Sequence, residues 1–242
     1  MKKLLILIMT IAMAMCFAGC GSSQTEETAE PEEAVSGGWE VVAEPADAGL
    51  PEDVQNAFDA ATENMTGNEL TPIAYFSKQI VSGTNYQILC QSMPAVEEPI
   101  PELQVAVIYQ DLEGNAEITN IADFDIANYS DNDGADVGRE EVTGGWEVPE
   151  DYTQAELPDN VREAFEKAIE QVGGSTFTPM AYLGSQVVAG TNYAVLMEGE
   201  LASQEPVSNI QVAIVYEDLD GNAELTNICT LDPADFTQQA EE

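Results

Sequence analysis

The chain has 242 residues, of which 45 are acidic and 6 are basic, so its formal net charge at pH 7 is -39. This balance excludes strong nucleic-acid binding, because phosphate contacts need clustered Lys and Arg, and it excludes a polybasic grip on anionic lipid. The chain also has no histidine, which excludes Ser-His and Cys-His nucleophile pairs and every His-based metal site. We therefore expect a protein that is not an enzyme and holds no cofactor.

The first twenty residues have the pattern of an export signal. Lys2 and Lys3 give a positive start, and the apolar run from Leu4 to Met15 is too short for a comfortable membrane span. The segment Phe17-Ala18-Gly19-Cys20 then resembles the lipobox of bacterial lipoproteins, although Phe stands where Leu is usual. This resemblance implies a lipid on Cys20 and a place in the cell envelope, on the outer face of the cytoplasmic membrane. An ordinary secretory signal that is cut nearby is the alternative.

A tether and two copies of one unit follow. Residues 21–36 are small, polar and acidic, which predicts a disordered segment. Three sequence blocks then recur in one register at a spacing of about 107 residues, which indicates a duplicated unit. The recurring pairs are Gly37–Val41 with Gly144–Val148, Gln79–Tyr86 with Gln186–Tyr193, and Asp111–Asn115 with Asp218–Asn222. We place the two domains at 37–125 and 144–236, with a polar linker at 126–143 and a short acidic tail at 237–242.

Within each unit, the patterns predict a strand, a helix and four more strands. The first strand covers Trp39 to Ala43, and Pro51 suits the first turn of the helix. Apolar residues at helical spacing run from Val54 to Met65 in the first copy and from Val161 to Val172 in the second. The four later strands of the first copy are expected at 73–80, 84–93, 103–109 and 116–121. The fold class that follows is α+β, with an antiparallel sheet wrapped on one helix in each unit.

Two further features carry weaker hypotheses. The linker stretch Tyr129–Gly134 loosely echoes a calcium loop, but Tyr129 stands where the first Asp ligand belongs, so we predict no metal there. Cys90 and Cys229 occupy non-equivalent positions of the two copies. Two such cysteines do not make a disulfide framework, so free thiols are favoured over a bridge between the copies.

The most specific motif is Gln-x-Val-x-Gly followed by Thr-Asn-Tyr. The second copy, Gln186–Tyr193, resembles the first binding loop of stefin-type cystatins, and the first copy carries the variant with Ile80 and Ser82. The motif lies about 41 residues after a double glycine, close to the spacing in that family. The resemblance implies two tandem cystatin-like domains and reversible, non-covalent inhibition of papain-like cysteine proteases.

In cystatins a glycine-containing N-terminal trunk and two hairpins form the wedge that enters the protease cleft. Carried over by position, the protease-binding residues of the first copy are Gly37, Gly38, Gln79, Ile80, Val81, Ser82, Gly83, Leu112, Glu113 and Gly114. Those of the second copy are Gly144, Gly145, Gln186, Val187, Val188, Ala189, Gly190, Leu219, Asp220 and Gly221. The glycines permit positive φ and a close backbone approach.

Two departures from the family pattern stand out. The second hairpin lacks the Pro-Trp pair of many secreted cystatins, so Leu112 and Leu219 are the apolar residues at its tip. The disulfides of secreted animal cystatins are missing, as they are in stefins. Because the second copy keeps the closer consensus, we expect it to be the tighter site. The alternative function is a surface-binding or adhesion lipoprotein that uses the same modules without inhibiting a protease.

Overall fold

The computed structural model describes residues 37–42, 49–130, 145–150, 152, 157–201 and 207–237. The expected signal segment with Cys20, the tether, Gly144 and the candidate calcium loop from residue 131 onward lie outside these ranges. The first copy contains β1 (Trp39–Val41), α1 (Glu52–Thr62), β2 (Asn68–Val81), β3 (Gly83–Pro94), β4 (Glu102–Gln110), β5 (Ala116–Asp123) and the 3-10 helix η1 (Ile126–Tyr129). The second contains α2 (Asp159–Ile169), β6 (Ser175–Val188), β7 (Gly190–Leu201), β8 (Ser208–Glu217), β9 (Ala223–Thr230) and the 3-10 helix η2 (Pro233–Phe236).

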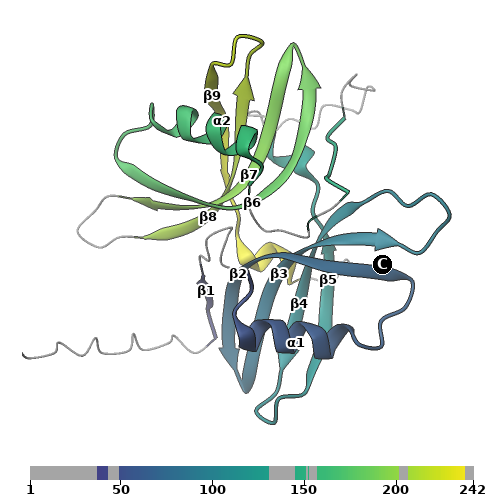
Figure 1. Ribbon diagram of the computed structural model, residues 1–242. Coiled ribbons are helices and arrows are strands. Elements are labelled where there is room, and N and C mark those ends of the chain that lie inside the picture. The colour runs from purple at the N-terminus through teal and green to yellow at the C-terminus, as the bar shows by residue number, and fades with distance from the viewer. Residues whose placement is uncertain are drawn as a thin grey trace, which may run out of the picture. The chain divides into compact units, whose positions relative to one another are not determined.

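Each copy forms one antiparallel sheet in which neighbours in the chain are neighbours in space. The strand order is β1-β2-β3-β4-β5 in the first sheet and β6-β7-β8-β9 in the second. The counterpart of β1 in the second copy is reduced to an isolated bridge between Glu147 and Ser185. Helix α1 lies across one face of the first sheet and α2 across one face of the second (Figure 1).

The helices begin and pack as their apolar spacing predicts. Pro51 and Pro158 precede their first turns, and acidic residues in those turns suit the positive end of the helix dipole. In α1 the buried residues Val54, Ala57 and Phe58 pack on the sheet. The helix ends at Thr62, earlier than the stripe predicted.

The opposite face of each sheet is apolar as well, and here the two copies meet. Along β3 the side chains alternate, so that Ile88 and Cys90 pack beneath α1 while Leu89 belongs to a different cluster. That second cluster draws on both copies, and we call it the shared core. Its buried members are Ile73, Ala74, Phe76, Leu89, Leu103, Val105, Phe124, Ile126, Tyr152, Met180, Ala181, Leu183, Ala194, Leu196, Ile210, Val212, Ile214, Leu231 and Phe236.

The short helices that follow β5 and β9 are exchanged between the copies. The side-chain amide of Asn120 donates to the carbonyl of Phe236 at 2.6 Å. Its counterpart Asn227 donates to the carbonyl of Tyr129, also at 2.6 Å. Asn120 and Asn227 are equivalent residues of the repeat, and each makes the same hydrogen bond to the other copy. The two-fold interface of a homodimer has this reciprocal arrangement. The described residues of both copies accordingly belong to one compact unit.

The predicted α+β fold class, with two tandem cystatin-like domains, is therefore wrong. The described chain is dominated by two antiparallel sheets with two α-helices, and its sheets are not simply wrapped on one helix each. An 11-residue helix spans roughly 16 Å, whereas β2 with its 14 residues runs for roughly 46 Å. The helix therefore covers only part of one face of the sheet. The other copy covers the opposite face.

Both remaining cysteines are free thiols. Cys90 is fully buried and Cys229 is partly exposed. Burial raises the pKa of the Cys90 thiol far above its ordinary value, so this residue behaves as a small apolar core residue. Among the residues that the structure describes, no helix combines the length and the apolar character that crossing a bilayer requires.

The shared core predicts that the copies unfold together. Leu196 of β7 is 1% exposed within it, so Leu196→Ala should cost about 3 kcal/mol of unfolding free energy. Hydrogen exchange followed by mass spectrometry should show faster exchange in β3 of the first copy as well as in β7. Ile100→Ala, at a residue 74% exposed, is the control that should change neither strand. Faster exchange in the second copy alone would contradict a common core.

Candidate functional site

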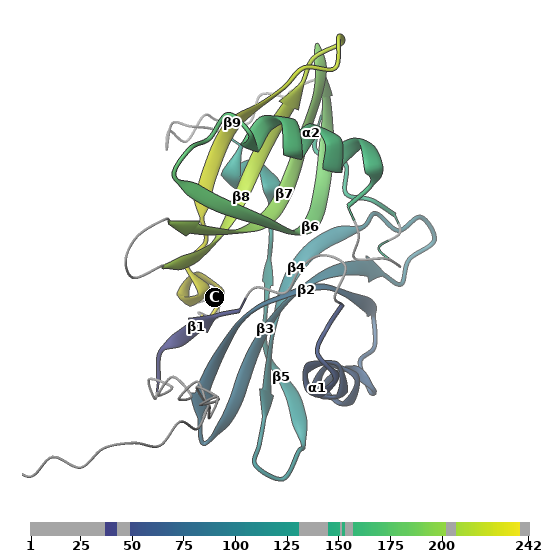
Figure 2. The same cartoon turned by 60° about the vertical axis from the view of Figure 1, so that its left-hand side comes forward.

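In the first copy two hairpins end side by side. The turn at residues 81–83 joins β2 to β3, and the turn at residues 111–115 joins β4 to β5. Thr84 of β3 pairs with Gln110 of β4, so both turns lie at the same end of the sheet (Figure 2). The hydroxyl of Tyr109 donates to the carbonyl of Ser82 at 2.6 Å and ties the two tips together.

The N-terminal glycines reach the same end. Trp39 of β1 pairs with Gln79 of β2. The N–H of Gly37 donates to the carbonyl of Ile80 at 3.2 Å, and the Gln79 side chain donates to the carbonyl of Gly37 at 3.0 Å. The Asn85 side chain in turn donates to the oxygen of the Gln79 amide at 2.8 Å. The structure thus brings the predicted trunk and both predicted hairpins together.

The structure requires glycine at position 83 of the first hairpin. Gly83 has a φ of +139°, and a Cβ there would collide with the carbonyl oxygen of Gln110 and lie 2.8 Å from the Tyr109 ring. Gly190 has a φ of +149° and the same neighbours in the second copy, namely Glu217 and Tyr216. A larger residue at either glycine would therefore push the two hairpins apart. Only variants elsewhere on the tips can test binding without that disturbance.

The second hairpin is held by a carboxylate cage. Oδ1 of Asp111 accepts from the backbone N–H of Glu113 at 2.8 Å and from that of Asn115 at 2.9 Å. The Asn115 side chain donates to the other oxygen at 2.8 Å. Asp218 and Asn222 repeat this arrangement in the second copy. These side-chain and backbone hydrogen bonds lower the pKa of Asp111 and of Asp218 below the ordinary value.

The second copy repeats the tie between its tips. The hydroxyl of Tyr216 donates to the carbonyl of Ala189 at 2.8 Å, and Asn192 donates to the Gln186 side chain at 2.9 Å. Glu147 and Ser185 exchange two backbone hydrogen bonds, of 2.8 and 3.0 Å, in the same register as Glu40 and Lys78. Gly145 is described and exposed, and Gly144 lies outside the described residues.

The tips carry apolar side chains that face solvent. In the first copy Ile80 is 38%, Val81 43% and Leu112 88% exposed. In the second copy Val187 is 65%, Val188 43% and Leu219 88% exposed. Of the other predicted hairpin residues, Ser82, Glu113, Gly114, Ala189 and Asp220 are exposed, while Gln79, Gln186 and Gly221 are partly exposed. Gly83 and Gly190 are buried. Each pair of hairpins is therefore a narrow, protruding, apolar edge.

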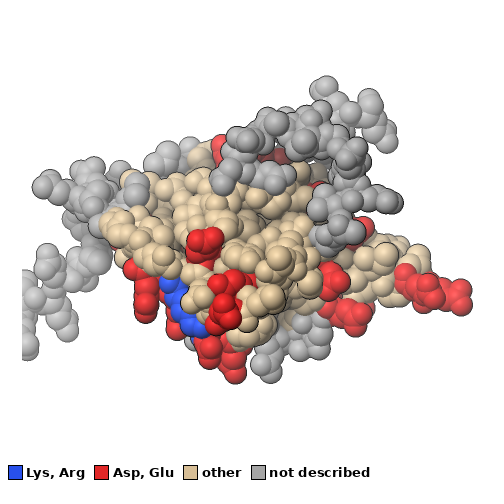
Figure 3. Space-filling view, turned by 90° about the horizontal axis from the view of Figure 1, so that it is seen from above, with Lys and Arg blue, Asp and Glu red and all other residues tan. Residues whose placement is uncertain are grey.

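Acidic residues dominate the charged surface of the described chain. Figure 3 shows Asp and Glu scattered over the visible face, with basic atoms confined to one small area. The described ranges contain three basic residues, Lys78, Arg162 and Lys167. The ion pair of Lys78 with Glu40, at 3.2 Å, is partly exposed and contributes little to stability. A strongly acidic partner would therefore be repelled.

One side chain that organises the tips lies outside the predicted motifs. Asn85 and Asp111 belong to the recurring blocks Gln79–Tyr86 and Asp111–Asn115, whereas Tyr109, whose hydroxyl ties one turn to the other, belongs to neither. Tyr109 is identical in the other copy, as Tyr216, so comparison of the two copies was the signal available. Tyr86 and Tyr193 are buried core residues.

Comparison with known proteins gives no family to which this chain can be assigned. No protein-family model and no curated protein matches this sequence. Within the described ranges, no three Cys, Asp or Glu side chains gather closely enough to hold a metal ion.

The first prediction for the site concerns Gly83. Gly83→Ala should lower the free energy of unfolding by about 2 kcal/mol, because it adds a strained positive φ and a collision with Gln110. Gly38→Ala is the matched control, since a Cβ at Gly38 meets nothing within 4 Å. Urea midpoints measure both. Equal midpoints for the two variants would contradict the requirement for glycine at position 83.

The second prediction concerns pH. The pKa of Asp111 is lower in the folded protein than the ordinary value near 3.9, so the ionised carboxylate stabilises the turn above that value. The stabilisation is lost as the pH falls through the folded-state pKa. In an NMR titration the amide signals of Glu113 and Asn115 should therefore move together, with a midpoint below the ordinary Asp range. Asp111→Asn should abolish this titration, and a midpoint above 3.9 would be inconsistent with the cage.

Proposed function

We propose that this protein is a reversible, non-covalent inhibitor of papain-like cysteine proteases, displayed at the outer face of the cytoplasmic membrane by a lipid on Cys20. The observation that carries the proposal is the meeting of three segments at one narrow edge. They are the glycines before β1, the Gln-x-Val-x-Gly hairpin and the neighbouring hairpin, and their apolar tips face solvent. The correction of the fold class leaves this edge unchanged, because it depends on two adjacent hairpins and one added strand.

The chemistry of the edge suits a plug. A protease cleft is concave and lined by backbone and apolar groups that receive an extended substrate, and a protruding edge complements it. Burying one Val or Leu side chain contributes about 1.5–3 kcal/mol, so the apolar tips supply a useful part of the affinity. No tip residue needs to react with the catalytic thiolate, which makes the inhibition reversible.

The two edges differ in ways that support a difference in affinity. Val187 is 65% exposed, whereas its counterpart Ile80 is 38% exposed. In the first copy Gly37 bonds to Ile80 and holds the trunk against the hairpin. The second edge therefore offers more apolar surface, in agreement with its closer match to the cystatin motif, and we expect it to bind more tightly.

The test is a titration of papain with the unlipidated chain from residue 21 onward, following residual protease activity. Two working edges predict that one chain inactivates two protease molecules. Val188→Asp with Leu219→Asp should weaken the second site by at least roughly 30-fold, because burial of two apolar side chains is replaced by burial of charge. Val81→Asp with Leu112→Asp should do the same at the first site, and the fourfold variant should not inhibit.

Matched controls separate a local effect from a general effect of added charge. Val96→Asp and Val207→Asp place the same substitution at valines that are 62% and 55% exposed but lie away from the tips. Both should leave inhibition intact. Absence of inhibition by the folded, unmodified chain at micromolar concentration would defeat the proposal and favour a surface-binding protein that does not inhibit.

A further inference from the structure

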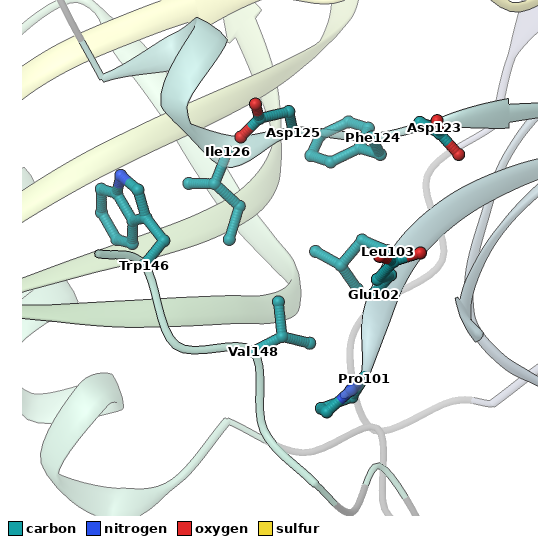
Figure 4. Close-up of a pocket in the computed structure, with 9 residues that line it drawn as sticks. All are labelled: Pro101, Glu102, Leu103, Asp123, Phe124, Asp125, Ile126, Trp146 and Val148. Atoms are coloured by element: carbon teal, nitrogen blue, oxygen red, sulfur yellow. The ribbon is translucent and has the colours of Figure 1, made fainter. Parts of the chain in front are cut away.

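A second site lies at the other end of the first sheet. A cavity of about 270 Å³ is ringed by the start of β4, the segment after β5 and the chain around Trp146 (Figure 4). Leu103 at its edge stands seven residues along β4 from Gln110 at the hairpin turn, which is roughly 24 Å of strand. The cavity is therefore separate from the proposed protease-binding tips.

About half of the cavity lining is apolar, and it includes an indole ring. Leu103, Phe124 and Ile126 form its floor and are at most 5% exposed. Trp146 and Val148 close one side and are only partly buried. In Figure 4 Trp146 lies beside Ile126, across the opening from Leu103. A ligand that enters would contact hydrocarbon on several sides and an aromatic ring on another.

Among the described residues that line the cavity, the charged ones are acidic. Glu102, Asp123 and Asp125 line the cavity and are exposed. Gln104 donates to Asp123 at 3.0 Å and orients it, while Asp125 accepts from the N–H of Ala127 at 2.9 Å. Both carboxylates are thus held by neighbours in the fold. Low-dielectric walls and the overall acidity concentrate negative potential in such a hollow.

We propose that this cavity binds a small organic cation whose charge is carried by an alkylated ammonium group. An apolar body would fill the floor, the indole face of Trp146 would attract the cation through its quadrupole, and the rim carboxylates would add attraction at short range. An inorganic cation would make no favourable contact with the apolar floor. A neutral molecule of the same shape would gain nothing from the rim.

The repeat itself provides a comparison. The residues equivalent to Glu102 and Asp123 in the second copy are Asn209 and Thr230, whereas Trp146 and Asp125 keep their counterparts, Trp39 and Asp232. Two of the three rim charges are therefore particular to one copy. The structural framework repeats without them, so the sheet does not require these carboxylates for folding.

The test uses choline as the probe and 3,3-dimethylbutan-1-ol as its neutral isostere, with the full chain from residue 21 onward. Isothermal calorimetry at constant ionic strength near physiological salt suppresses diffuse attraction of cations. Fluorescence in a Trp39→Phe background makes Trp146 the reporting tryptophan. Choline should bind with a Kd of about 1 mM or tighter, as expected for so small a ligand, and the neutral isostere should bind at least tenfold more weakly.

Variants then assign the binding to the cavity. Glu102→Asn with Asp123→Thr installs the residues of the other copy and should weaken choline binding at least tenfold. Trp146→Leu should weaken it as well, with circular dichroism confirming the fold. Glu163→Gln with Glu166→Gln removes two exposed charges on α2, on the far face of the second sheet, and should have no effect. No binding of choline, equal binding of the isostere, or equal effects of the two charge-removing pairs would overturn the proposal, and none of these results bears on protease inhibition at the tips.

Discussion

The burial of both faces of each sheet is the constraint on which the rest of the structure depends. A sheet with one covered face alternates apolar and polar side chains, and its other face stays in water. Here the strands carry continuous apolar runs such as Val105-Ala106-Val107-Ile108, all of them buried. A helix meets one face and the other copy meets the second. Each copy therefore contributes half of one shared hydrophobic core, although its sequence repeats as that of an independent domain would.

This constraint also explains what could be predicted from the sequence. Local signals were sufficient for the helices, since the stripe that contains Val54 and Phe58 is buried as its spacing requires. Turn chemistry located both hairpins, because Gly83 and the turn after Asp111 carry strong local preferences. The association of the copies depends on which apolar surfaces meet, and no local pattern reports that. The continuous apolar run in β4 indicates that both faces of the strand are buried, but it does not say what covers them.

The candidate site was predictable to the extent that it is made of turns. Motif spacing identified the segments that meet at the tips, and strand pairing follows directly from an antiparallel meander. The hydrogen bond between the hairpins could not be predicted, because Tyr109 lies 27 residues after Ser82 in the chain and meets it only through folding. Such a contact joins residues distant in sequence. Comparison of the two copies recovers it, since a tyrosine that recurs with the hairpin is part of the hairpin.

The shared core bears on how the tips could act. An edge made of two hairpins binds well only if the hairpins keep their spacing, because ordering them on binding would consume affinity. Three devices limit their movement: the tie from Tyr109 to Ser82, the cage around Asp111 and the sheet behind them. The sheet is the stiffest of the three, since it is packed on both faces and interiors of that kind deform little. The rigidity of the tips therefore depends on burial of the sheet face that lies away from the helix. The second copy of the repeat supplies the surface that buries this face.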